Sequence, residues 1–212
     1  MLPTLFALLC AVFVAVLLHA ERRDDARLRW IAKTAASAAF VATALAAGAL
    51  DSAYGLWILL ALILCMAGDV LLIPAGKATF LAGMGAFALG HLAYAGAFVS
   101  GGAAPSAIFF AGAIVMAVFA GASLKWLWPH LGDFRIPVAV YTAIIAVMAA
   151  TSTLAAPPGV TAPHWPVIAG AFGFAVSDLA VARDRFVSPG FINRVWGLPL
   201  YYGAQLLLAG SV

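Results

Sequence analysis

Residues 55–74 read GLWILLALILCMAGDVLLIP and contain a single charge, Asp69. An apolar run of about 20 residues is long enough to cross the hydrocarbon core of a bilayer as a helix. A carboxylate in the middle of such a helix costs free energy, so it usually belongs to a site. The pattern returns in GAFGFAVSDLAVA, residues 170–182, where Asp178 is the lone charge. Both stretches predict membrane helices that carry a functional acid.

The whole chain has the composition of an integral membrane protein. Of its 212 residues, 66% are hydrophobic and 9% are charged, and the mean hydropathy is +1.09. A soluble domain has about 25% charged residues. We predict an all-α polytopic membrane protein with eight transmembrane helices in one bundle, forming a single domain over residues 1–212. The helices are expected at 2–20, 30–50, 55–74, 80–100, 106–124, 136–155, 164–182 and 194–210.

Basic residues outside the predicted helices follow only the odd-numbered ones, and the connections after even-numbered helices have no Lys or Arg. Positively charged loops stay in the cytoplasm. Both termini are therefore predicted to be extracytoplasmic, in a bacterial inner membrane. The first apolar run lacks a basic leader and is expected to be retained as a helix. The basic residues are Arg22, Arg23, Arg27, Arg29, Lys77, Lys125, Arg135, Arg183, Arg185 and Arg194.

Several functions are disfavoured by the residues outside these helices. The net charge of +3 is explained by topology, so no nucleic-acid partner is expected. Cys10 and Cys65 lack metal-ligand spacing and are interpreted as packing residues. His19, His130 and His164 lie at or outside helix ends, with no paired-His motif. A zinc hydrolase is disfavoured for this reason, and no metal or cofactor is predicted.

The polar side chains that remain inside the predicted helices form a short set. Eight of them lie about 5 to 17 Å inside the cytoplasmic ends of their helices, at a rise of 1.5 Å per residue. Unrelated polar residues would scatter over both leaflets. The shared depth therefore predicts a water-filled pocket that opens toward the cytoplasm. The set is Lys33, Asp69, His91, Tyr94, Tyr141, Ser177, Asp178, Tyr201, Tyr202 and Gln205.

These residues also have structural interpretations. The acids could simply pair with bases, but Lys33 is the one cation inside a predicted helix and cannot neutralise both. Lys33 could also extend its ammonium group to the cytoplasm. His91 could be a hydrogen-bonded packing residue rather than a catalytic one. Ser177 has no base at a recognisable spacing, so a nucleophilic role is disfavoured.

A weak internal symmetry relates the two halves of the chain. Asp69 and Asp178 are 109 residues apart, and each lies in the third helix of a four-helix half. The same offset brings Lys33 next to Tyr141. This spacing suggests a parallel 4+4 pseudo-repeat, which would place the two carboxylates across a central cavity.

Five motifs then identify a family. They are CMAGDVLL, FALGHLAYAGAF, RIPVAVYTAIIAVM, GAFGFAVSDLAVARDRF and LPLYYGAQLLLA, in this order along the chain. Together they resemble the YhhN-like lysoplasmalogenase family of eight-helix membrane proteins. The resemblance implies hydrolysis of the vinyl ether bond of a lysoplasmalogen, which gives a fatty aldehyde and a glycerophospho-base. It also implies a lysophospholipid substrate within the membrane.

The resemblance, carried over residue by residue, points to Lys33, Asp69, His91, Tyr141, Ser177, Asp178, Tyr202 and Gln205. Vinyl ether hydrolysis needs an acid that protonates the alkene carbon, a nearby negative charge and an activated water. We hypothesise that Asp69 and Asp178 divide the acid and base roles. Catalytic roles are also expected for His91, Tyr141, Tyr202 and Gln205, which would orient water and the ether oxygen. Substrate binding is expected from Lys33, as a ligand of the lipid phosphate, and from Ser177, Tyr201 and Tyr94.

Two other functions use the same residues. A proton-coupled transporter or lipid carrier can employ intramembrane Asp, His and Lys as a proton relay. The confinement of charge to one half of the bilayer speaks against it, because alternating access needs a site reachable from both sides. A non-catalytic scaffold could use the polar cluster to set helix register.

Overall fold

The protein is described here by a computed structural model, which covers residues 1–155 and 164–212. Within these ranges the chain forms eight α-helices and no strand. All eight predicted segments are helical, and their ends lie within four residues of the prediction. The helices are α1 (Leu2–Arg23), α2 (Ala26–Ala47), α3 (Ala53–Leu71), α4 (Lys77–Ser100), α5 (Ala107–Leu127), α6 (Arg135–Ser152), α7 (Trp165–Ala182) and α8 (Phe191–Ala209).

Local capping explains where the helices begin and end. Asp25 accepts a hydrogen bond from the Leu28 N–H at 2.9 Å, so α2 starts four residues before the predicted position at 30. Ser52 caps α3 in the same way through the N–H of Gly55. α2 ends at Ala47, and the residue that caps it, Gly48, has a φ of 104°, which is readily available only to glycine.

Short irregular turns extend three of the helices. The 3₁₀ turns η1 (Trp128–His130) and η2 (Gly132–Phe134) connect α5 to α6, and η3 (Thr153–Ala155) follows α6. A single π-helical turn, η4 (Arg183–Val187), continues α7. π-Helical turns are rare in proteins, and many of those that occur lie at functional sites. The side chains on η4 are therefore candidates for a functional role.

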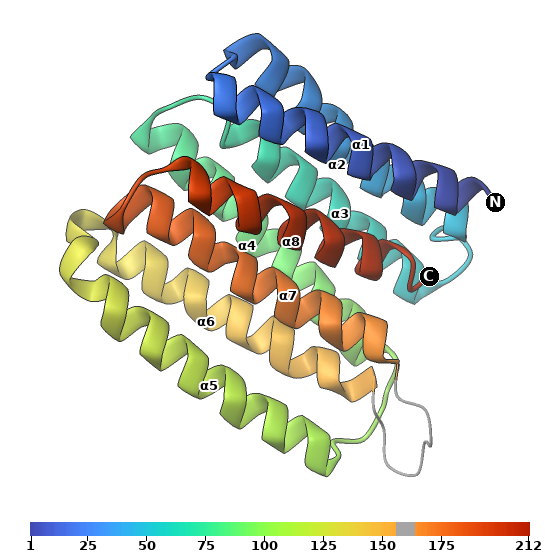
Figure 1. Ribbon diagram of the computed structural model, residues 1–212. Coiled ribbons are helices and arrows are strands. Elements are labelled where there is room, and N and C mark those ends of the chain that lie inside the picture. The colour runs from blue at the N-terminus through green and yellow to red at the C-terminus, as the bar shows by residue number, and fades with distance from the viewer. Residues whose placement is uncertain (156–163) are drawn as a thin grey trace.

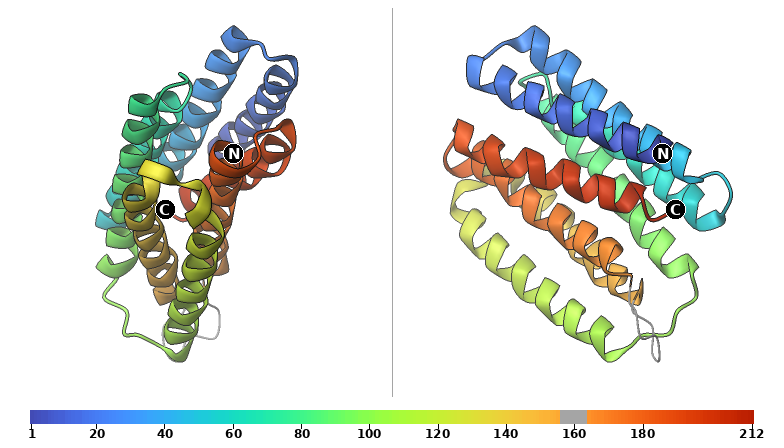
Figure 2. Two further views of the ribbon diagram at one scale, coloured as in Figure 1. Left: turned by 90° about the vertical axis from the view of Figure 1, so that its left-hand side faces the viewer. Right: turned by 45° about the vertical axis from the view of Figure 1, so that its right-hand side comes forward.

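Six helices pack into a closed ring, in the order α2, α3, α4, α6, α7, α8 and back to α2. α1 packs outside this ring against α2 and α8, and α5 packs outside it against α6. Figure 1 shows α1 at one edge of the bundle and α5 at the opposite edge. The two further views in Figure 2 show that the helices run nearly parallel to one another. The ten polar residues predicted inside the membrane helices all belong to the six helices of this ring.

Glycines let neighbouring helices approach closely. A Cβ at Gly90 of α4 would lie 2.8 Å from the Cys65 Sγ of α3. A Cβ at Gly197 of α8 would collide with the Cβ of Ala180 on α7. Small residues are typical of helix contacts inside membranes, because helices there associate through close packing rather than through the hydrophobic effect. Cys65 and Cys10 are both buried free thiols, in agreement with their interpretation as packing residues.

Seven of the helices, α1 to α7, are long and apolar enough to cross a membrane. α8, at 19 residues, is not among these seven. The two termini lie at the same end of the bundle (Figure 1). We call the opposite end, where α1 joins α2, α3 joins α4, α5 joins α6 and α7 joins α8, the basic end. The 4+4 pseudo-repeat stays a prediction.

Candidate active site

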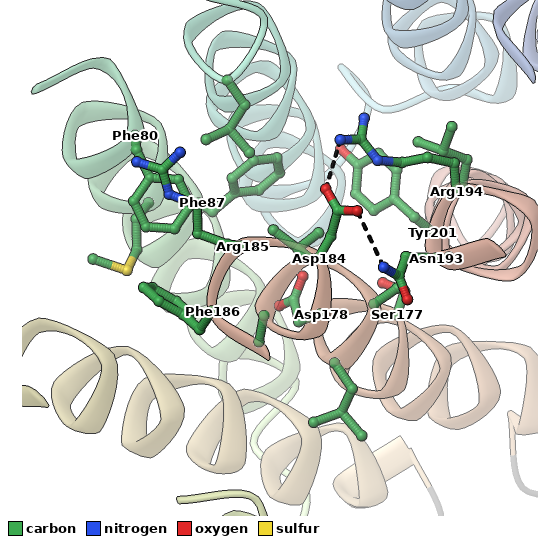
Figure 3. A pocket seen from close by; sticks show the side chains of 18 of the residues that line it. Phe80, Phe87, Ser177, Asp178, Asp184, Arg185, Phe186, Asn193, Arg194 and Tyr201 are labelled. Atoms are coloured by element: carbon green, nitrogen blue, oxygen red, sulfur yellow. Dashed lines mark hydrogen bonds and ion pairs between the residues drawn. The ribbon is translucent and has the colours of Figure 1, made fainter. Parts of the chain in front are cut away.

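A cavity of about 520 Å³ enters the bundle from the basic end. Its mouth is formed by the connections between α1 and α2, between α3 and α4, and by η4. Figure 3 looks at this cavity, with Asp178 near the centre, Phe80 and Phe186 on one side, and Arg194 and Asn193 on the other. Both lone acids, Asp69 and Asp178, line it.

Asp69 is surrounded by hydrogen-bond donors. Its Oδ2 accepts hydrogen bonds from Tyr201 Oη and Ser37 Oγ, both at 2.7 Å. Its Oδ1 lies 3.4 Å from Lys33 Nζ. The Asp69 side chain is 4% exposed and that of Lys33 is 13% exposed, so this is a buried ion pair. Both carboxylate oxygens are therefore engaged.

A second layer of side chains holds this arrangement from behind. The Tyr202 hydroxyl lies 3.2 Å from Ser37 Oγ. Gln205 donates through Nε2 to Tyr201 Oη at 3.1 Å and accepts from Tyr94 Oη at 2.6 Å. Tyr202, Gln205 and Tyr94 are fully or almost fully buried and do not belong to the cavity wall. They orient Tyr201 and Ser37, which in turn contact Asp69.

Asp178 has a separate and sparser set of contacts. Tyr141 Oη donates to its Oδ2 at 3.1 Å, and His91 Nε2 lies 3.2 Å from the same hydroxyl. With Tyr141 donating to Asp178, the His91 Nε2–H is the donor to Tyr141. His91 Nε2 is also 3.6 Å from Asp178 Oδ2. Asp178 Oδ1 has no hydrogen-bond partner among the residues that the structure describes.

An aromatic wall separates these two sets of contacts. Phe174 is fully buried, and its ring centroid lies 4.5 Å from that of His91 and 5.1 Å from that of Tyr201. Phe87 packs edge-on against both Phe174 and Tyr201. The two acids therefore reach the same cavity from two independently built environments. Asp69 contacts the ammonium group of Lys33 and two hydroxyl donors, whereas Asp178 accepts from the phenol of Tyr141 and lies near the imidazole of His91.

Ion pairs tie the mouth of the cavity together. Arg194 of α8 lies 3.1 Å from Glu21 of α1 and 2.6 Å from Asp184 of η4. Arg29 of α2 also pairs with Glu21, at 3.3 Å. Figure 3 shows Asp184 between Arg194 and Asn193, on one side of the opening. At the basic end, these contacts join the helix pair α1 and α2 to the helix pair α7 and α8.

The structure thus brings the ten predicted residues into one region, in two layers. Six of them line the cavity: Lys33, Asp69, Tyr141, Ser177, Asp178 and Tyr201. The other four, His91, Tyr94, Tyr202 and Gln205, lie behind that wall. Ser177 donates its hydroxyl to the backbone oxygen of Phe174 at 2.7 Å, a local bond within its own helix. Among the described residues, no three His, Cys, Asp or Glu side chains gather to hold a metal ion.

Sequence reasoning missed Ser37, Arg185 and the apolar wall. Ser37 lies one helical turn after Lys33, and that spacing places both on one helix face; this was the available signal. The apolar part of the cavity is built by α4, α5 and α6 and contains Met84, Met116, Phe119, Leu127, Val138 and Ile145. No periodic pattern in an all-apolar helix indicates which residues face a cavity.

Fold and site together define an α-helical membrane protein with an amphipathic cavity lined by two acids. The chain belongs to the YhhN family, whose model matches residues 28–212. A lysoplasmalogenase of Mycobacterium tuberculosis is 36% identical over 163 residues, which cover 73% of this chain and 59% of that protein. Lysoplasmalogenase TMEM86A of Homo sapiens is 33% identical over 158 residues, which cover 73% of this chain and 64% of that protein.

The Bos taurus TMEM86A gives a similar result, with 34% identity over 158 residues. The chain therefore matches about three-fifths of the length of these curated relatives. No solved structure gives a significant match. The family resemblance predicted from the five motifs is confirmed.

Proposed function

We propose that the protein is a membrane hydrolase that cleaves the vinyl ether bond of lysoplasmalogens. The main support is that one cavity combines two acids, the buried Asp69 and the partly exposed Asp178, with a wall of apolar side chains, as a single-chain ether lipid requires. The names of the relatives, which are lysoplasmalogenases, support this substrate class. They do not favour a transporter or carrier. Lysoplasmalogens are ether lipids, so the activity would belong to lipid metabolism.

The proposal includes an orientation in the membrane. α8 would be the eighth span, because it packs within the ring between α7 and α2 rather than outside it. The basic end would face the cytoplasm, which places both termini outside it. The cavity would then open to the cytoplasmic leaflet of a bacterial inner membrane, where a lysophospholipid can enter from the lipid phase.

The reaction begins with transfer of a proton from a carboxylic acid to the alkene carbon next to the ether-bearing carbon. The carbon–carbon π electrons form the new C–H bond, and an oxocarbenium ion results. Water then adds to the cationic carbon and loses a proton to a base. The hemiacetal hydroxyl then gives its proton to the carboxylate that began the reaction as the acid. The bond from carbon to the glycerol oxygen breaks, that oxygen takes the proton that the base had received from water, and the aldehyde and the alcohol are released. The net reaction consumes one water and regenerates both acid and base.

We assign the acid role to Asp178 and the base role to Asp69. Asp178 Oδ1 is free of protein partners among the described residues and its side chain is 17% exposed in the cavity, so it can reach the alkene carbon. Both oxygens of Asp69 are engaged by donors and by Lys33. Asp69 thus provides the negative charge that stabilises the oxocarbenium ion and receives the proton of the attacking water.

The remaining residues position these two groups. The His91–Tyr141 pair fixes the Asp178 carboxyl through Oδ2 and leaves Oδ1 directed to the substrate. Tyr202 and Gln205 act behind the wall, through Ser37 and Tyr201. The hydrocarbon chain would occupy the apolar side of the cavity between α4, α5 and α6. We expect the chain to enter between α4 and α5, because α5 packs on α6 and has few contacts with α4.

The test is aldehyde release from a lysoplasmalogen by the purified protein in detergent. Asp178→Asn and Asp69→Asn should each lower kcat by at least about a hundredfold, in line with the loss of a general acid or base. Asp133→Asn, which removes an exposed acid at the same end of the bundle, is the matched control and should keep full activity. Full activity in Asp178→Asn or Asp69→Asn would contradict the mechanism. Aldehyde formation should be absent with an ordinary acyl lysophospholipid.

A further inference from the structure

The basic residues that line the cavity differ in whether an acid neutralises them. Three of the four are paired: Arg29 with Glu21 and Asp24, Lys33 with Asp69, and Arg194 with Glu21 and Asp184. The fourth, Arg185, has no acidic partner among the residues that the structure describes. Among the described residues of this wall, it is the one cation whose charge is available to a ligand.

Arg185 is placed where a ligand entering from the basic end would meet it. It belongs to the π-turn η4, is exposed, and lines the cavity mouth. Its guanidinium carbon lies 4.7 Å from the centroid of the Phe80 ring. Figure 3 shows the Arg185 side chain against Phe80, on the opposite side of the opening from the Asp184–Arg194 pair. The aromatic contact limits the directions that the guanidinium can take.

Arg185 and Asp178 both line the cavity. Asp178 lies in α7, and Arg185 lies seven positions further along the chain, in the π-turn η4 that continues this helix. Asp178 likewise has no Lys or Arg partner among the described residues. Among the described residues, the cavity therefore presents one acid without a Lys or Arg partner, Asp178, and one cation without an acidic partner, Arg185, at its mouth.

We infer that Arg185 binds the phosphate of a single-chain lipid headgroup and so sets the position of the ether bond against Asp178. In a lysoplasmalogen, three glycerol carbons and one oxygen separate the ether oxygen from the phosphorus, so one molecule can reach both residues. A planar guanidinium suits two phosphate oxygens at once. Phosphate binding by Lys33 stays a prediction, and in the structure its ammonium group lies 3.4 Å from Asp69 Oδ1. The identity of the lipid rests on the proposed function.

Binding without turnover tests this inference. The probe is a saturated 1-O-alkyl lysophosphocholine, which has no vinyl ether to cleave, and the comparison is the phosphate-free 1-O-alkylglycerol. Kd is measured with purified protein in a maltoside detergent, so that no bulk phospholipid is present. Arg185→Gln should weaken binding of the phospholipid about tenfold, because a charge-assisted hydrogen bond at a partly exposed site is lost. Binding of the alkylglycerol should not change.

Arg135→Gln is the matched control. Arg135 is also an exposed arginine at the basic end, and it lies over the ring of Trp128 at 5.4 Å, but it does not line the cavity. Both variants lose one positive charge at the basic end, so any effect of that charge on membrane orientation is the same in the two. Equal Kd values for the two variants would overturn the inference. Displacement of the lipid by millimolar inorganic phosphate would also overturn it, because the site would then be one for free anions.

The outcomes separate this inference from the proposed function. If the wild-type protein releases no aldehyde but Arg185→Gln still weakens phospholipid binding, the headgroup site stands and the hydrolase proposal fails. If aldehyde is released, Arg185→Gln should raise KM for the lysoplasmalogen about tenfold, and it should lower kcat less than Asp178→Asn does, because the ether bond is held less precisely while the acid is still present. Aldehyde release with wild-type KM and Kd in Arg185→Gln would refute the headgroup site alone.

Discussion

The buried pair of Lys33 and Asp69 predicts an asymmetric loss of stability when either partner is removed. Lys33→Met leaves the Asp69 carboxylate without its cation at a position where the side chain is 4% exposed. Removing one partner of a buried ion pair costs about 3 to 5 kcal/mol. We expect the lower end, about 3 kcal/mol, because the charges are 3.4 Å apart and two hydroxyl donors at 2.7 Å remain on Asp69.

Asp69→Asn should cost less. Lys33 is 13% exposed, near the cavity mouth, and its flexible side chain can move its ammonium group toward water. The asparagine oxygen still accepts from the hydroxyls of Ser37 and Tyr201. A loss of about 1 to 2 kcal/mol is expected, typical of one weakened buried hydrogen bond to a charged group. The double variant Lys33→Met/Asp69→Asn should cost about as little as Asp69→Asn alone, because no buried charge remains.

The free energy of unfolding is measured by titration with sodium dodecyl sulfate from maltoside micelles, followed by the fluorescence of the six tryptophans. Lys77→Met is the control for a loss of one cation. Its pair with Asp133 is shorter, at 2.9 Å, but the side chains are 60% and 83% exposed, so no measurable change is expected. A double variant whose loss equals the sum of the two single losses would refute the argument, as would a larger loss in Asp69→Asn than in Lys33→Met.

Two further predictions concern the hydrogen bond from Tyr141 to Asp178 and the packing of α7 against α8 in the six-helix ring. Tyr141→Phe removes the hydroxyl that links His91 to Asp178, and we expect kcat for the vinyl ether to fall about tenfold to a hundredfold with little change in Kd; an unchanged kcat would exclude the positioning role. Gly197→Ala should destabilise the protein by about 1 to 3 kcal/mol, because the added methyl group meets Ala180 of α7. Gly121→Ala, where nothing lies within 4 Å of the new Cβ, is its control and should leave the unfolding midpoint unchanged. Equal midpoints for the two glycine variants would contradict the packing of α7 on α8.

Much of the fold was predictable because it depends on local chemistry. Apolar run length decides where a membrane helix forms, and each backbone group is satisfied within its own helix. The missed boundary at α2 shows the limit of that rule. Arg27 and Arg29 look like loop residues, but the Asp25 cap allows helical structure to begin before them.

Most of the polar part of the candidate site was also predictable, since a polar residue inside a membrane helix is costly and stands out in an apolar sequence. All ten residues named from the sequence lie in or directly behind one cavity wall. Their division of labour was not predictable. Tyr201 and Tyr202 are adjacent in the sequence, yet only Tyr201 lines the cavity.

Only the tertiary structure decided which charges are neutralised. Lys33 could pair with Asp69, pair with Asp178 or bind a ligand, and the sequence leaves these choices equal. The packing of α2 against α3 places its ammonium group 3.4 Å from Asp69. It leaves Asp178 and Arg185 without a charged partner of the Lys, Arg, Asp or Glu type among the described residues. Ion pairing depends on distances of a few ångströms between different helices, and helical periodicity within one segment carries no information on those distances.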